Sequence, residues 1–157
     1  MVQLLIWGPV VLLPLANLLS AFHSGVSFDC SQTALWVLGA VAEELFYRFF
    51  LLKKLLLDRS GMKGANAVFL VAVLFAAMHL FNLRTGADLF PVLVQAFCAF
   101  CFSVWAGAVV WKRGSVALPL LAHVLSNLTA FEGGGLLIPL AAGILVLIAG
   151  LFLLGIK

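Results

Sequence analysis

The sequence LLIPLAAGILVLIAGLFLLG occupies residues 136–155 and contains no charged side chain. An α-helix rises about 1.5 Å per residue, so a run of roughly 20 residues spans about 30 Å, the thickness of a bilayer's hydrocarbon core. Five further apolar runs precede it, at about 4–22, 34–57, 67–83, 90–111 and 116–131. This pattern predicts an all-α polytopic membrane protein, a bundle of about six transmembrane helices that uses residues 1–157 as a single domain.

The overall composition also indicates a membrane protein. Of the 157 residues, 65% are hydrophobic and 10% are charged, and the mean hydropathy is +1.23. Soluble domains carry about 25% charged residues. The formal net charge of +3 does not indicate a nucleic-acid partner, because the basic residues stand in small groups between apolar runs. The lipid bilayer is therefore the expected surrounding of most of the chain, and the pattern predicts no particular oligomeric state.

The basic residues predict an orientation in the membrane. They concentrate in the second and fourth connections, at Lys53, Lys54, Arg59 and Lys63 and at Lys112 and Arg113. In a chain of six spans these two connections lie on the same side, which the positive-inside rule places in the cytoplasm. Both termini are then expected in the cytoplasm, with Arg84 as an exception on the opposite side.

The second apolar run carries three ionisable residues near its middle, Glu43, Glu44 and Arg48. Each costs about 2.5–3.5 kcal/mol at the centre of a membrane helix, so such residues are expected to face the bundle interior and to have a function. Glu44 and Arg48 have the i,i+4 spacing of an ion pair, whereas Glu43 is turned away by about 100°. We expect Arg48 to neutralise Glu44 and leave Glu43 as a free base. The alternative is a buried pair that only orients helices.

Two later runs add polar side chains. His79 lies in the third run, and the fifth contains His123 and Asn127 at i,i+4 spacing on one helical face. Taken singly, each is more often a packing or interhelical hydrogen-bonding residue than a catalytic one. Three helices that carry such groups at comparable depth make the packing interpretation weaker for the set than for each member.

These residues form an ordered set of three short motifs: E-E-x-x-x-R at Glu43, Glu44 and Arg48, F-x-x-x-H at Phe75 and His79, and H-x-x-x-N at His123 and Asn127. The set resembles the CAAX protease and bacteriocin-processing (CPBP, or Abi) family of intramembrane glutamic proteases, which includes the type II CAAX prenyl endopeptidase. The resemblance implies an endopeptidase whose core lies within 34–131. It also implies that Glu43 and His79 activate water, that His123 and Asn127 stabilise the oxyanion, and that Glu44 and Arg48 support the site.

The resemblance favours a metal-free mechanism with no cofactor and no metal ligands. Zinc stays open as an alternative, because one glutamate and two histidines match the three ligands of a catalytic zinc site. The H-E-x-x-H motif of zinc proteases is absent from the sequence.

The substrate implied by the resemblance is a membrane-embedded protein or peptide. The chain is short, with one predicted span before the helix of Glu43 and one after that of Asn127, and no farnesyl-binding site is apparent. Short members of this type are similar to bacterial enzymes that cut C-terminal sorting signals or small precursors, among them the JDVT-CTERM systems. We therefore expect an integral protein of a prokaryotic inner or plasma membrane.

Two alternatives from other functional classes fit the same residues. A non-catalytic membrane scaffold or immunity-type factor could retain the polar site as architecture. A small proton-coupled transporter could use Glu43, Glu44 and the histidines as a proton relay, although no inverted repeat with paired broken helices is apparent.

Overall fold

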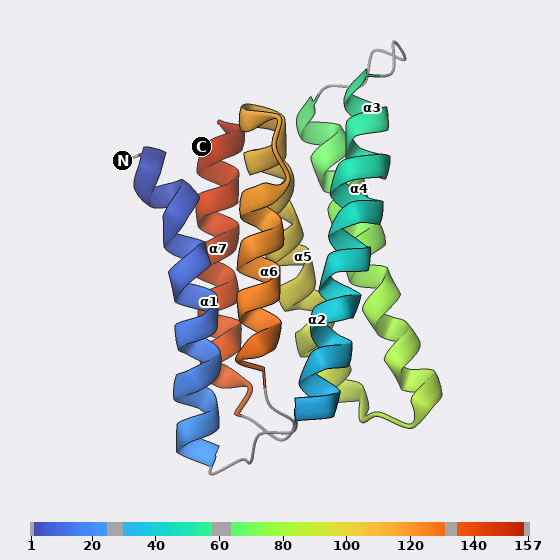
Figure 1. The fold of residues 1–157 in the computed structure, drawn as a ribbon, viewed down its shortest axis with the longest axis vertical. Helices are drawn as coiled ribbons and strands as arrows, with labels where there is room; N and C mark the ends of the chain where they lie inside the picture. Colours follow the sequence, from blue (N-terminus) through green and yellow to red (C-terminus); the bar gives the residue numbers. More distant parts are fainter. Residues whose placement is uncertain (1, 25–29, 58–63, 131–134, 156–157) are drawn as a thin grey trace.

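The computed structural model describes residues 2–24, 30–57, 64–130 and 135–155. Within these ranges every regular element is a helix, which confirms the all-α prediction (Figure 1). The described residues form six helical rods. In chain order they are α1 (Val2–Ser24), a rod of α2 (Cys30–Glu44), η1 (Leu45–Leu52) and α3 (Lys53–Leu57), a rod of α4 (Gly64–His79) and η2 (Leu80–Thr85), α5 (Leu89–Arg113), α6 (Ala117–Leu128) and α7 (Leu137–Leu154).

Among the described residues, four stretches are long and apolar enough to cross a membrane: Val2–His23, Gly64–Thr85, Leu89–Arg113 and Leu137–Leu154. The rod from α2 to α3 carries five charged residues, Glu43, Glu44, Arg48, Lys53 and Lys54. Helix α6 is shorter than expected. With 12 residues, α6 is about 18 Å long, against a hydrocarbon core of about 30 Å. It ends at Leu128, and the hydroxyl of the next residue, Thr129, donates to the carbonyl of Leu125 at 2.9 Å.

Helix α5 lies at the centre of the packing, and its residues 101–110 are all buried. Glycines let its neighbours approach closely, as is common between membrane helices. A Cβ atom on Gly107 would lie 2.8 Å from Cγ1 of Val68 on α4, and one on Gly150 of α7 would lie 2.8 Å from the backbone nitrogen of Trp105. The contacts of α5 with α4 and α7 therefore depend on the absence of side chains.

The same tryptophan ties α5 to α1. Pro9 has no N–H to donate to the carbonyl of Leu5, four residues earlier, so this carbonyl needs another partner inside the membrane. Nε1 of Trp105 donates to it at 3.0 Å. The interhelical hydrogen bond replaces the one that proline removes from α1.

Two rods depart from α-helical geometry. Residues 45–52 form a π-helix of eight residues, which starts directly after Glu44, and residues 80–85 form a 3₁₀ helix whose N-cap is His79. π-Helical segments are rare and are frequently found at functional sites. Both departures follow directly after residues of the predicted site.

Candidate active site

The buried ion pair expected from the sequence is present in the second rod. Nη1 of Arg48 lies 3.0 Å from Oε1 of Glu44, and the two side chains are 0% and 1% exposed. The guanidinium carbon lies 4.3 Å from the ring centroid of Phe75 and 5.3 Å from that of Phe102. Two aromatic faces and one carboxylate therefore stabilise the buried cation, because a cation over a ring is attracted by the negative face of its π-system.

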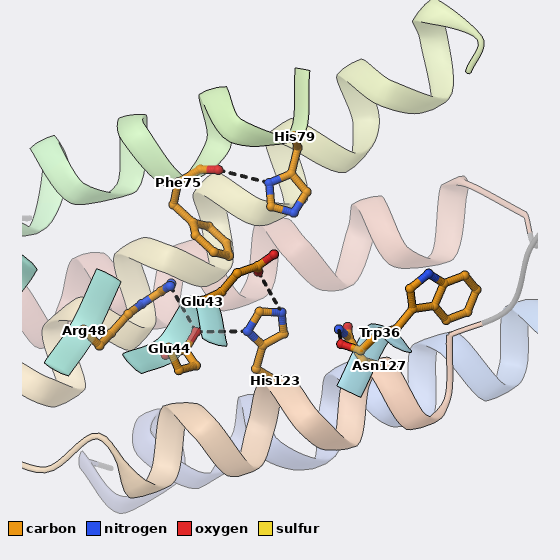
Figure 2. A network of polar contacts seen from close by, with 8 residues as sticks. All are labelled: Trp36, Glu43, Glu44, Arg48, Phe75, His79, His123 and Asn127. Carbon is orange, nitrogen blue, oxygen red and sulfur yellow. Dashed lines mark hydrogen bonds and ion pairs between the residues drawn. The ribbon is translucent and has the colours of Figure 1, made fainter. Parts of the chain in front are cut away.

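His123 lies between the two adjacent glutamates (Figure 2). Its Nδ1 is 3.0 Å from Oε1 of Glu44, and its Nε2 is 3.8 Å from Oε2 of Glu43. A carboxylate paired with Arg48 can only accept, so Nδ1 of His123 carries the proton and donates it to Glu44. Glu44 thereby fixes the orientation of the imidazole, a link that the helical spacing of Glu43, Glu44 and Arg48 did not predict.

Three predicted residues from three rods line one cavity of about 620 Å³: Glu43 from α2, His79 from α4 and Asn127 from α6. The side chain of Glu43 is 32% exposed, in contrast to that of its buried neighbour Glu44. His123 is buried and does not line the cavity, and Figure 2 shows its ring next to the carboxylate of Glu43. The structure therefore brings all four residues together, three on the cavity wall and one next to Glu43.

Backbone carbonyls orient two of these side chains. Nδ1 of His79 lies 3.0 Å from the carbonyl of Phe75, one turn earlier, so Nδ1 donates and Nε2 is left as an acceptor. In Figure 2 the carboxylate of Glu43 lies between the ring of His79 and the ring of His123. Nδ2 of Asn127 donates to the carbonyl of Trp36 at 2.8 Å, which leaves its second N–H and its oxygen for other partners.

Two further polar residues line the cavity and were not predicted as site residues. They are Asn82 of η2 and Gln95 of α5, and Nδ2 of Asn82 donates to Oε1 of Gln95 at 2.8 Å. An amide inside an apolar run was the available signal for Gln95. No helical pattern joined the two, because the contact between them depends on how α5 packs against η2.

The described residues contain no group of three or more His, Cys, Asp and Glu side chains placed to hold a metal ion. The histidines and glutamates of the site are instead engaged with one another or with backbone. Whether zinc takes part in the reaction is decided by chelation in solution.

The site offers the elements of acid–base chemistry on a carbonyl group. A carboxylate, an imidazole acceptor and an amide donor line one cavity. A base within reach of a water molecule and donors preorganised for a developing negative charge are the requirements for hydrolysis of a peptide bond.

Comparison with protein families gives a match. Residues 30–129 match the family described as type II CAAX prenyl endopeptidase Rce1-like, a stretch that contains all six predicted site residues. Neither curated proteins nor solved structures gave a match. The family match covers more than half of the chain and agrees with the motif resemblance. The chain therefore belongs to the Rce1-like family of type II CAAX prenyl endopeptidases, which indicates an intramembrane protease.

Proposed function

We propose that this protein is a glutamic intramembrane endopeptidase that hydrolyses a peptide bond in a membrane-associated protein or peptide, with Glu43 as the base. One observation carries the proposal. Of two adjacent glutamates, Glu43 faces the cavity together with His79, whereas Glu44 is buried and engaged by Arg48 and His123. The arrangement separates a reactive carboxylate from a structural one.

The proposed reaction starts with a water molecule held between the carboxylate of Glu43 and Nε2 of His79. Glu43 takes a proton from the water as its oxygen attacks the carbonyl carbon of the substrate, which forms a tetrahedral oxyanion. The C–N bond then breaks, and the proton on Glu43 passes to the leaving amine. Atoms and charges balance without any co-reactant other than water.

We assign stabilisation of the oxyanion to Asn127 and His123. The free N–H of Asn127 is one donor. His123 is the proposed second donor, although it lies off the cavity wall with Nε2 3.8 Å from Oε2 of Glu43. Because its Nδ1 already donates to Glu44, it can donate to the oxyanion only through a protonated Nε2, and Glu44 orients the ring as the aspartate does in a serine protease triad. Arg48 acts only through Glu44, so Glu44 and Arg48 are positioning residues.

The substrate we propose is a membrane-embedded protein or peptide, with C-terminal sorting signals or small precursors as the first class to test. Apolar side chains share the cavity wall with the polar ones, among them Leu35, Met78 and Phe81. A segment from the membrane could therefore enter without exposing its side chains to water, and neither a cofactor nor a prenyl group is required by this chemistry.

The orientation we propose puts both termini in the cytoplasm of a prokaryotic cell. The N-terminus, the C-terminus and α3 lie at one end of the bundle (Figure 1), and α5 ends there with Lys112 and Arg113. In a cysteine-free background, a membrane-impermeant thiol reagent applied to intact cells should label Asp88→Cys and spare Ser115→Cys. The reverse pattern would invert the topology.

The proposal can be tested with purified protein in proteoliposomes and three quenched fluorogenic peptides. Two end in cysteine, two aliphatic residues and a final residue, with and without a farnesyl group. The third is an apolar segment of about 20 residues with a short basic tail. The wild type should cleave at least one, and Glu43→Gln should abolish cleavage while its thermal unfolding is unchanged.

Asp88→Asn is the matched control, because it makes the same carboxylate-to-amide change at an exposed residue outside the cavity. This variant should retain full activity. Near-normal turnover by Glu43→Gln would show that Glu43 is not the base. A scaffold or a transporter would give no Glu43-dependent cleavage product.

A further inference from the structure

The amide pair Asn82 and Gln95 has no part in the proposed bond cleavage, yet both residues line the same cavity as Glu43 and His79. The side chains are joined by one hydrogen bond, from Nδ2 of Asn82 to Oε1 of Gln95 at 2.8 Å. The hydrogen bond is exposed, since Gln95 is exposed and Asn82 is half-buried. The remaining polar groups of both amides are therefore accessible to a partner that enters the cavity.

The 3₁₀ geometry of η2 determines where Asn82 stands. A 3₁₀ helix has three residues per turn, so side chains three apart are eclipsed. Asn82 follows His79, the N-cap of η2, by one such turn, which aligns the two along one edge. At about 2.0 Å per residue they are about 6 Å apart along the axis. In a continuous α-helix Asn82 would be turned about 60° off this edge.

A local hydrogen bond holds this turn in place. The hydroxyl of Thr85 donates to the carbonyl of Asn82 at 2.7 Å. Gly86 ends the segment with a φ of 87°, a left-handed conformation that glycine adopts without a steric penalty. The position of Asn82 relative to His79 is thus fixed by the backbone of η2 rather than by the rotamer of a long side chain.

The hydrogen-bonding groups that remain on the pair match those of a peptide main chain. Gln95 keeps its two N–H donors, and Asn82 keeps its carbonyl oxygen as an acceptor. One residue of an extended peptide offers one N–H and one C=O, which in an apolar site must both be paired. A helical segment offers neither, because its amides are already bonded to one another.

We propose that the Asn82–Gln95 pair binds the main chain of an unwound substrate segment beside the scissile bond. This inference rests on the proposed function and names its substrate form, an extended peptide rather than a helix. An extended chain advances about 3.3 Å per residue, so a contact about 6 Å from His79 falls within about two residues of the bond that is cut. Asn82 and Gln95 are positioning residues for the substrate.

The test uses the proteoliposome assay with the peptide that the wild type cleaves best, and a series in which single peptide bonds near the cleavage site are replaced by esters. An ester removes one N–H donor and weakens the adjacent acceptor. The variant Asn82→Leu/Gln95→Met removes both amides and keeps their approximate shapes, so it should fold normally. Gln3→Met is the control, because it replaces a glutamine far from the cavity in the same way. Gln3 accepts a hydrogen bond from Arg113, and Arg113 follows Gln95 by 18 residues, so it lies about 27 Å away along α5.

We expect the double variant to raise KM at least tenfold with kcat changed less than threefold, and the control to behave as wild type. One or two ester positions within two residues of the cleaved bond should lower kcat/KM of the wild type at least fivefold, with no effect in the double variant. Equal ester sensitivity of the wild type and the double variant would overturn the proposal.

Binding to the Glu43→Gln protein separates this inference from the proposed function. Fluorescence anisotropy with the same peptides should show weaker binding when Asn82→Leu/Gln95→Met is added. Peptide binding that depends on the pair, without cleavage by the wild type, would uphold the inference and reject the protease mechanism. Cleavage and binding that are both independent of the pair would do the opposite.

Discussion

The packed side of the bundle, formed by α1, α5 and α7, and the cavity side, between α2 and α6, each contain a glycine with very different surroundings. On the side of α1, α5 and α7, Gly150 lies against the backbone of Trp105, so that even one added carbon would meet it at 2.8 Å. On the cavity side, Gly39 of α2 lines the cavity, and an added carbon would meet nothing within 4 Å. Gly150 thus allows two helices to touch, whereas Gly39 borders open space.

Polar groups also differ between the two sides, although Oγ of Ser103 on α5 is buried without a hydrogen-bond partner among the described residues. On the packed side, the carbonyl that Pro9 leaves unpaired is satisfied by the indole of Trp105. On the cavity side, Oε2 of Glu44 and all three guanidinium nitrogens of Arg48 are buried and make no hydrogen bond among the described residues, so the 3.0 Å contact of Nη1 with Oε1 of Glu44 is an ion pair without hydrogen-bond geometry. Irregular helical segments and buried polar atoms without hydrogen bonds are expected at functional sites.

Loss of the buried cation Arg48 should cause the largest loss of stability. Arg48→Ala leaves the charge of Glu44 buried beside His123 alone, and breaking a buried pair in this way typically costs about 3–5 kcal/mol. We expect lower yield and a lower unfolding midpoint in detergent, together with loss of activity. The control Glu44→Gln/Arg48→Met removes both charges and should recover most of the stability but not the activity. Equal instability of the two variants would contradict a role for the unpaired charge.

The glycines provide a matched pair with effects of opposite sign. Gly150→Ala forces α7 away from the backbone of Trp105, and overpacking of this kind costs about 1–3 kcal/mol. Gly39→Ala meets no atom and replaces a flexible residue within a helix, so it should raise stability by up to about 1 kcal/mol. Thermal unfolding of both variants measures the difference. Destabilisation by Gly39→Ala equal to that by Gly150→Ala would show that the cavity side is packed as tightly.

The interhelical hydrogen bond of the packed side predicts a smaller effect. Trp105→Phe leaves the carbonyl of Leu5 without a donor and should cost about 1 kcal/mol, within the range of interhelical hydrogen bonds in membranes. Pro9→Ala restores an N–H within α1 that can satisfy this carbonyl. In the Pro9→Ala background, the loss of the indole N–H should therefore cost measurably less. Additive effects of the two substitutions would contradict the link between them.

Local spacing was sufficient to predict what lies within one helix. The apolar runs predicted the six rods from helical periodicity, and the i,i+4 spacing predicted the ion pair of Glu44 and Arg48, which forms although Arg48 lies within the π-helix η1. The same reasoning failed at η1, where a π-helix replaces the α-helix directly after Glu44. Periodicity carries no signal for such a change, which depends on the packing of the surrounding rods.

Contacts between rods were predicted only where the motifs joined them. The ordered motifs predicted that Glu43, His79, His123 and Asn127 belong to one site, but not that His123 donates to Glu44. Nor did they predict the hydrogen bond between Asn82 of η2 and Gln95 of α5. These contacts require the relative placement of helices, and the catalytic roles of the four residues remain predictions for the activity assays.

The smallest expected effect is that of removing metal ions. In the metal-free mechanism Glu43 and His79 hold the water directly, so 1,10-phenanthroline or EDTA should leave the cleavage rate of the reconstituted enzyme unchanged.

A zinc mechanism would instead need Glu43, His79 and His123 as ligands, with neutral imidazole nitrogens turned to one ion. Nε2 of His123 lies 3.8 Å from Oε2 of Glu43, so a small movement would suffice to bring these two ligands together. Loss of activity with the chelator, recovered by stoichiometric zinc and not by magnesium, would show that a metal ion activates the water. Activity that persists through chelation, in protein whose zinc content is below one per ten chains, leaves the carboxylate of Glu43 as the base that activates water.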